Sequence, residues 1–242
     1  MELNRKKSKK SKIELRTKIL LVILFVIIDI FLIFSFIRIR EAVSINKLNN
    51  KFNDLLEVSF ISDDYDDSVS TTGKYRVVEK AMNDYFIGYS DKSKEVLDII
   101  NSDELKNLFT VDNYGKGDPQ FSSSINYVVT TRADLDKRFE ELYNYSTEEY
   151  IESYINKISD DKKVRKLFKD YMYSIEANNY FDDCNSLLKA KQDEVNNILD
   201  VAKELFTFLA SNDGKWLIKD GQIQFANNDL KNQYDGYISR IK

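Results

Sequence analysis

Residues 174–210 have the sequence SIEANNYFDDCNSLLKAKQDEVNNILDVAKELFTFLA, in which apolar side chains return every seven residues. Two interleaved sets form the stripe: Phe181, Leu188, Val195, Ala202 and Leu209, and then Cys184, Ile198 and Leu205. Lys191 interrupts the second set, and flanking apolar residues make the stripe wider than a two-stranded coiled coil needs. The pattern predicts a central helix, roughly 50 Å long, packed in a helical bundle.

Shorter helical patterns precede this segment. Apolar spacing predicts one helix over residues 75–89 and a short one over 96–100. Ser102 and the two acidic residues after it predict the capped start of another helix. Residues 111–124 contain two glycines and the only proline, and we expect a loop there.

Three helix starts are expected after that loop. Thr131 is the candidate cap of the first helix. Residues 146–149, Ser-Thr-Glu-Glu, form a candidate capping box for the second. Asp160 or Asp161 is expected to open the third.

Near the C-terminus the sequence pattern changes from helical to strand-like. Residues 214–218 and 222–225 are short strand-like runs, and Asp220-Gly221 between them is a strong hairpin signal. A last helix is expected over residues 228–241. Trp216 is the candidate structural anchor that joins the hairpin to the bundle.

This ending, WLIKDGQIQF over residues 216–225 with Tyr234 in the helix that follows, resembles that of an uncharacterised family of bacterial envelope lipoprotein-like proteins. The resemblance implies an envelope location and a helical body with a C-terminal hairpin and helix. It implies no activity. The chain departs from that family because it has an apolar anchor in place of a lipid-modified cysteine.

The N-terminus predicts that anchor. Residues 1–18 form a basic arm with eight lysines and arginines against two glutamates. Residues 19–37 are apolar except Asp29 and Ser35, and as a helix they would extend roughly 28 Å, which matches a bilayer core. The run exceeds the core of a signal peptide, and no small-residue cleavage site follows it. We therefore expect an uncleaved transmembrane helix.

Charge predicts the orientation of the chain. The excess of lysine and arginine before the span places the N-terminus in the cytoplasm and the rest outside. The chain carries −4 overall, so residues 38–242 carry −9 once the arm (+6) and Asp29 (−1) are set apart. We expect a helical stalk and acidic linker over 38–73 and an extracytoplasmic helical domain over 74–242.

Asp29 lies near the centre of the expected span, where a carboxylate is costly. It is a candidate contact with another membrane helix; the alternative is a protonated side chain that the apolar run tolerates. The basic arm is a topology signal or a binder of anionic lipid head groups. Nucleic acid is not an expected partner, since the arm is short and the large domain acidic.

Most catalytic chemistry is excluded. The chain has no histidine, which removes Ser-His-Asp and Cys-His catalysis and His-containing zinc sites. Its one cysteine, Cys184, cannot form an intramolecular disulfide and is expected to be a small buried side chain. Glu148, Glu149 and Glu152 could serve carboxylate-only hydrolysis, but helix capping already explains their position.

Ligand sites are weakly indicated. Asp63, Asp64, Asp66 and Asp67, and the loop over residues 112–118, could offer oxygens to Ca²⁺, but they lack an EF-hand register and fit solvated loops equally. Residues 115–117, Gly-Lys-Gly, lack the spacing of a phosphate loop. Four tyrosines could line a groove, although core packing explains them as well: Tyr85, Tyr89, Tyr150 and Tyr154.

The sequence thus predicts a mainly α protein: one transmembrane helix, an extracytoplasmic bundle with a long central helix, and a small hairpin plus helix. We expect a binding or scaffold protein of the bacterial envelope, with no catalysis, cofactor or metal. Its expected partners are the lipid bilayer and another membrane or cell-surface protein. The alternatives are a carboxylate-only cell-wall-active enzyme and a small-ligand or metal-binding sensor domain.

Overall fold

The computed structural model describes residues 2–61, 64–114 and 117–241, and the side chains of these residues from Leu24 onward. Within this part, nearly all regular structure is helical, and the elements follow in this order: α1 (Glu2–Glu57), α2 (Lys74–Ile100), α3 (Asp103–Lys106), α4 (Val111–Tyr114), α5 (Ser122–Tyr145), α6 (Glu148–Ile158), α7 (Lys162–Met172), α8 (Ile175–Ser211), β1 (Trp216–Lys219), β2 (Gln222–Phe225) and α9 (Asn228–Ser239).

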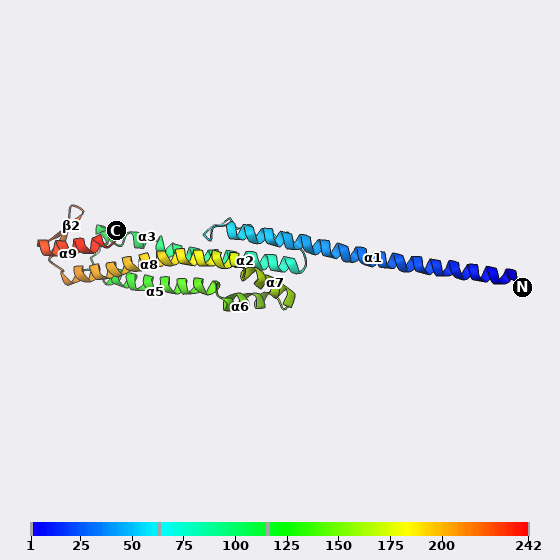
Figure 1. Ribbon diagram of the computed structural model, residues 1–242. Helices are drawn as coiled ribbons and strands as arrows, with labels where there is room; N and C mark the ends of the chain where they lie inside the picture. Colours follow the sequence, from blue (N-terminus) through cyan, green and yellow to red (C-terminus); the bar gives the residue numbers. More distant parts are fainter. Residues whose placement is uncertain (1, 62–63, 115–116, 242) are drawn as a thin grey trace.

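The bundle is elongated. Helices α2, α5 and α8 run side by side along it, and the N-terminal part of α1 extends far beyond one end (Figure 1). The hairpin and α9 lie at the opposite end (Figure 1). The mainly helical fold with a C-terminal hairpin and helix is therefore confirmed.

Helix α1 includes the expected span 19–37 and continues to Glu57. Among the described residues, no helix is both long and apolar enough to cross a membrane. Residues 19–23 of the expected span lie outside the residues whose side chains are described. From Leu24 to Ile39 almost every apolar side chain of α1 is exposed.

The C-terminal part of α1 belongs to the core of the bundle. Leu48, Phe52 and Leu55 are buried, and Phe52 meets Phe86 of α2 edge to face at 6.3 Å between ring centroids. Residues expected to form a stalk thus contribute to the packing that holds α2 in place.

Residues 64–73 run back along α1 as a strap. Lys51 bonds to Asp66, Lys47 donates to the carbonyl of Ser70 at 3.0 Å, and Arg40 donates to the hydroxyl of Thr72 at 3.3 Å. The partners on α1 descend in number as those on the strap rise, so the strap is antiparallel to α1. Helix α2 consequently starts near Arg40 and runs parallel to α1.

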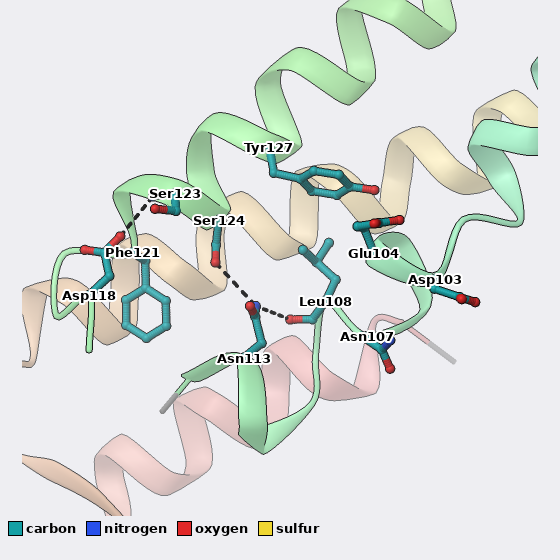
Figure 2. Close-up of a pocket in the computed structure, with 10 residues that line it drawn as sticks. All are labelled: Asp103, Glu104, Asn107, Leu108, Asn113, Asp118, Phe121, Ser123, Ser124 and Tyr127. Atoms are coloured by element: carbon teal, nitrogen blue, oxygen red, sulfur yellow. Dashed lines mark hydrogen bonds between the residues drawn. The ribbon is translucent and has the colours of Figure 1, made fainter. Parts of the chain in front are cut away.

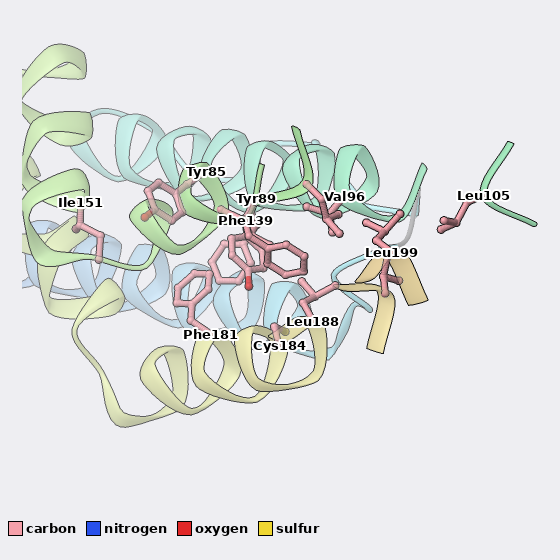
Figure 3. Packing of buried hydrophobic residues seen from close by; sticks show 14 of the residues in the cluster. Tyr85, Tyr89, Val96, Leu105, Phe139, Ile151, Phe181, Cys184, Leu188 and Leu199 are labelled. Carbon is pink, nitrogen blue, oxygen red and sulfur yellow. The ribbon is translucent and has the colours of Figure 1, made fainter. Parts of the chain in front are cut away.

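The long helix is confirmed. Helix α8 begins after Ser174, whose hydroxyl accepts from the backbone N–H of Ala177 at 3.2 Å. Both apolar sets face the core, except that Ile198 is half-buried. Figure 3 shows Phe181, Cys184 and Leu188 packed against Tyr89 and Phe139.

Two helix boundaries differ from the expectation. One continuous α2 replaces the predicted helices over 75–89 and 96–100, because the polar residues between them bond within the helix: the hydroxyl of Ser93 donates to the carbonyl of Tyr89. Helix α5 starts at Ser122 rather than at Thr131, and α4 and the first turn of α5 occupy much of the expected loop 111–124.

Two of the predicted caps are confirmed, whereas Thr131 lies inside α5 and caps no helix. Ser102 and Asp161 cap α3 and α7, as expected. Helix α6 is capped by Thr147 and not by Ser146. The Ser146 hydroxyl instead accepts from the amide of Asn185 at 2.9 Å, which ties the α5–α6 turn to α8.

The predicted hairpin is present, with Trp216 opposite Phe225 and Lys219 opposite Gln222. Asp220 and Gly221 both have positive φ angles, 54° and 70°, as a two-residue hairpin turn requires.

Candidate functional site

A polar cleft of about 530 Å³ lies beside α3 (Figure 2), which is at the end of the bundle opposite the one from which α1 extends (Figure 1). Helix α3, the α4 segment and the start of α5 form its walls. Ten residues line it: Asp103, Glu104, Asn107, Leu108, Asn113, Asp118, Phe121, Ser123, Ser124 and Tyr127.

Side-chain hydrogen bonds hold the walls together. The Asn113 amide donates to the carbonyl of Leu108 at 2.9 Å and to the hydroxyl of Ser124 at 3.3 Å, which links α4 to both walls. The Asp118 carboxylate accepts from the backbone N–H of Ser123 at 2.9 Å and so serves the first turn of α5. The cleft is therefore supported by its own lining residues.

Phe121 stands at the base of the cleft in a strained conformation. Its φ of 53° lies in the left-handed region, which costs a side chain other than glycine about 1–2 kcal/mol. Its ring is 2% exposed and stacks on Phe206 at 5.4 Å with an interplanar angle of 10°. Packing against α8 thus offsets the strain, and strain of this kind is concentrated at functional sites.

Trp216 connects this base to the hairpin. Its indole ring lies 5.9 Å from the Phe121 ring, and its N–H donates to the carbonyl of Leu209 at 2.9 Å. The structure therefore places the candidate anchor between the last turn of α8 and the residue under the cleft.

The lining is rich in hydrogen-bonding groups and acidic in charge. Asp103, Glu104 and Asp118 are its charged residues, and none of the ten described lining residues is a lysine or arginine. Glu104 and Asn107 are exposed and make no side-chain hydrogen bond to another described residue. This chemistry suits a neutral or cationic ligand that offers several hydroxyl or amine groups.

Asp66 of the first candidate Ca²⁺ loop has protein partners. Asp66 accepts from Ser68 and from Lys51, and the Ser68 hydrogen bonds together with Lys51 lower the pKa of this carboxyl to about 2. Asp63 lies outside the described residues, as do residues 115–116 of the second loop. Over the described ranges, no group of three or more His, Cys, Asp or Glu side chains is arranged to hold a metal ion.

The candidate carboxylates on α6 lie outside the cleft. Glu148 and Glu149 are exposed in the first turn of the helix, and Glu152 forms an ion pair with Lys169 of α7. The structure therefore does not bring these three carboxylates together with Asp103, Glu104 and Asp118.

The tyrosines form core rather than a groove. Tyr85 is fully buried, and its ring contacts Tyr154 edge to face at 5.0 Å. Tyr89 is buried and donates to the side-chain oxygen of Asn185 at 2.9 Å. Cys184 is buried, as expected, and this burial raises the pKa of its thiol to about 12.

Asp29 is exposed on α1. Its contact with another membrane helix stays a prediction. The cleft itself was missed in the sequence: its lining residues all lie within residues 103–127, but no local pattern reveals how the short segments of this stretch pack against one another. The one available signal was the loop over 111–124, with its glycines and proline.

Comparison with protein-family models, with curated proteins and with solved structures found no match.

Proposed function

We propose that this chain is a membrane-anchored binding protein of the bacterial cell envelope that presents the polar cleft away from the membrane and catalyses no reaction. Residues 19–37 are the anchor, the N-terminus is cytoplasmic, and the bundle lies outside. The lysine and arginine bias and the exposed apolar side chains of α1 support this arrangement.

The observation that carries the proposal is the distance between anchor and cleft. Helix α1 leaves the bundle where α2 begins, and α3, whose residues line the cleft, follows the other end of α2 (Figure 1). The 27 residues of α2 extend about 40 Å at 1.5 Å per residue. A rigid spacer of this length suits a protein that reaches a component outside the lipid head groups.

The partner is another membrane or cell-surface component with hydrogen-bonding groups. The test is photo-crosslinking in intact cells, with a photoreactive amino acid at Asn107 in the cleft or at Glu140, an exposed site on α5 outside it. We expect a specific adduct from position 107 and none from position 140. The same adducts from both positions, or none from either, would refute a binding role for the cleft.

A second comparison tests the span. Asp29→Leu should remove any adduct that depends on a contact between membrane helices, whereas a cleft ligand should still crosslink to position 107. An unchanged list of partners would assign the span to anchoring alone.

The two alternatives make different predictions for the same cleft. A carboxylate-only hydrolase would release soluble fragments from purified cell wall, and Asp103→Asn, Glu104→Gln or Asp118→Asn would abolish that release. A Ca²⁺ sensor would unfold at a higher temperature with Ca²⁺ than with a chelator, because a ligand that binds only the folded state stabilises it. We expect neither effect.

A further inference from the structure

The end of the bundle nearest the anchor is built from three separate segments. Helix α6 runs toward this end, since Tyr154 donates to the carbonyl of Ala81 near the start of α2. Helix α7 returns from it, and Tyr171 donates to the side-chain oxygen of Asn49 at 2.6 Å. The turn between α6 and α7 therefore lies at the end from which α1 extends, as Figure 1 shows.

Helix geometry places the α6–α7 turn at the same position along the bundle as the point where α1 leaves it. On α7, Lys162 lies nine residues before Tyr171, and on α1, Arg40 lies nine residues before Asn49, the partner of Tyr171. Each separation is about 14 Å along its helix. Arg40 also contacts Thr72, next to the start of α2. We define residues 38–41, 72–76 and 157–166 as the anchor-side face.

The anchor-side face is basic although the domain is acidic. It contains nine lysines and arginines against three carboxylates, whereas residues 38–242 as a whole carry −9. The cations come from all three segments: Arg38, Arg40, Lys74, Arg76, Lys157, Lys162, Lys163, Arg165 and Lys166. Such segregation of charge within one domain indicates a partner of opposite charge on that side.

Several of these cations lack a protein partner. Arg38, Arg76, Lys157, Lys162 and Lys163 are exposed and form no ion pair with any residue that the structure describes. Their charge is therefore available to a ligand.

Apolar groups accompany the charge. Phe36, Ile37 and Ile39 are exposed on α1 and line two grooves of about 380 and 370 Å³ that also contain Arg40. Ile158, at the end of α6, is 39% exposed. Basic and apolar side chains mixed in this way are typical of surfaces that rest on a bilayer.

We infer that the anchor-side face docks on the bilayer surface and binds the headgroups of anionic phospholipids. This inference rests on the proposed membrane anchor. Arg38 follows directly after the expected span, and Arg40 is about 3 Å further along the helix, so the face begins at the depth of the phosphate groups. Charge complementarity and continuity with the span thus select a lipid occupant over a soluble partner, and docking fixes the direction in which the bundle points.

The test uses the full chain in nanodiscs of zwitterionic lipid, with or without phosphatidylglycerol. A fluorophore at Ile158→Cys, in a Cys184→Ala background, reports energy transfer to an acceptor attached to lipid headgroups. We expect phosphatidylglycerol to increase the transfer, and high salt to remove the increase.

Charge reversal gives the matched comparison. Lys162→Glu with Lys163→Glu changes the net charge of the anchor-side face from +6 to +2 and places acidic residues in the first turn of α7, where they suit the helix. We expect this pair to lose the increase in transfer, and Lys215→Glu with Lys219→Glu at the hairpin end to keep it. Lys162→Gln with Lys163→Gln should show an intermediate loss, which guards against misfolding of the reversed pair.

Equal transfer in both lipid mixtures, or an increase that survives the reversal, would overturn the inference. Alkaline carbonate extraction of the same chain from membranes separates this failure from that of the anchor. A chain that resists extraction but shows no effect of lipid charge is anchored without docking, whereas a chain that is extracted lacks the proposed anchor, and both results count against docking.

Discussion

Glu79 of α2 fixes the strap, and its substitution should loosen the join between α1 and the bundle. The side chain is 1% exposed. One carboxylate oxygen accepts from the backbone N–H and the hydroxyl of Ser70, at 2.9 and 3.1 Å. The other accepts from the same two groups of Thr71, at 2.8 and 2.6 Å. Four donors from the strap thus converge on one buried charge.

Glu79→Gln keeps the shape of the side chain but turns an amide NH₂ toward two of these donors. Each donor left unpaired in the interior costs about 1–3 kcal/mol, so we expect a loss of about 2–4 kcal/mol in the free energy of unfolding. The measurement is urea unfolding of the full chain in detergent, followed by circular dichroism. Hydrogen exchange over residues 64–73 should rise at the same time.

The contribution of Glu79 to the stability of the fold depends on pH, and the direction of the pKa shift fixes its sign. Burial alone would raise the pKa of Glu79, but the hydrogen bonds from Thr71 and Ser70 outweigh it and lower the pKa. The associated stability is therefore present above the unfolded pKa of about 4.3 and is lost as the pH falls through the folded pKa. Glu79→Gln should remove this loss.

The matched control is Glu140→Gln, an exposed glutamate on α5 that should change stability by less than about 0.5 kcal/mol. A Glu79→Gln variant as stable as this control, with unchanged exchange in the strap, would refute the role assigned to the carboxylate.

Three further predictions concern the rest of the bundle. Trp216→Ala should destabilise the chain by about 2–4 kcal/mol, since the ring is half-buried. Trp216→Phe should cost only about 0.5–1.5 kcal/mol, for the lost hydrogen bond. Equal melting temperatures for Trp216→Ala and the parent would contradict this. Cys184 should react with a maleimide at neutral pH only after unfolding, because burial raises the pKa of its thiol to about 12; rapid labelling of the folded chain would count against this packing. Gly221→Ala should lower the free energy of unfolding by about 1–2 kcal/mol, because the φ of 70° at this position disfavours a side chain. An unchanged thermal unfolding temperature would show that the turn adopts another conformation.

The sequence was most informative where a pattern is long and local. The seven-residue repeat of α8 extends over many turns, and Asp220-Gly221 specifies its own turn, so both elements could be predicted without tertiary information. Helix boundaries were harder to predict from the sequence. Residues 90–95 of α2 are polar, but Ser90 and Ser93 are buried inside the bundle, which no local pattern reveals.

The cleft and the anchor-side face could not be found by spacing. The cleft depends on Asn113 and Asp118 bonding across short segments, and on Phe206, 85 residues after Phe121, as the support of its base. The anchor-side face depends on the return of α7 to the level at which α1 leaves the bundle. The anchor-side face and the support of the cleft base arise from contacts between residues that are far apart in the chain, whereas the lining of the cleft lies within residues 103–127.

The central claim is that the bundle lies outside the cell membrane at the end of an uncleaved anchor. The most direct test is labelling of intact cells with a membrane-impermeant maleimide, in a Cys184→Ala background. One variant carries Lys219→Cys in the hairpin, and the other carries Ser8→Cys in the basic arm. The account predicts that position 219 is labelled in intact cells and position 8 only after lysis, on a chain that keeps its full length. Labelling of position 8 in intact cells, or protection of position 219 until lysis, would contradict it.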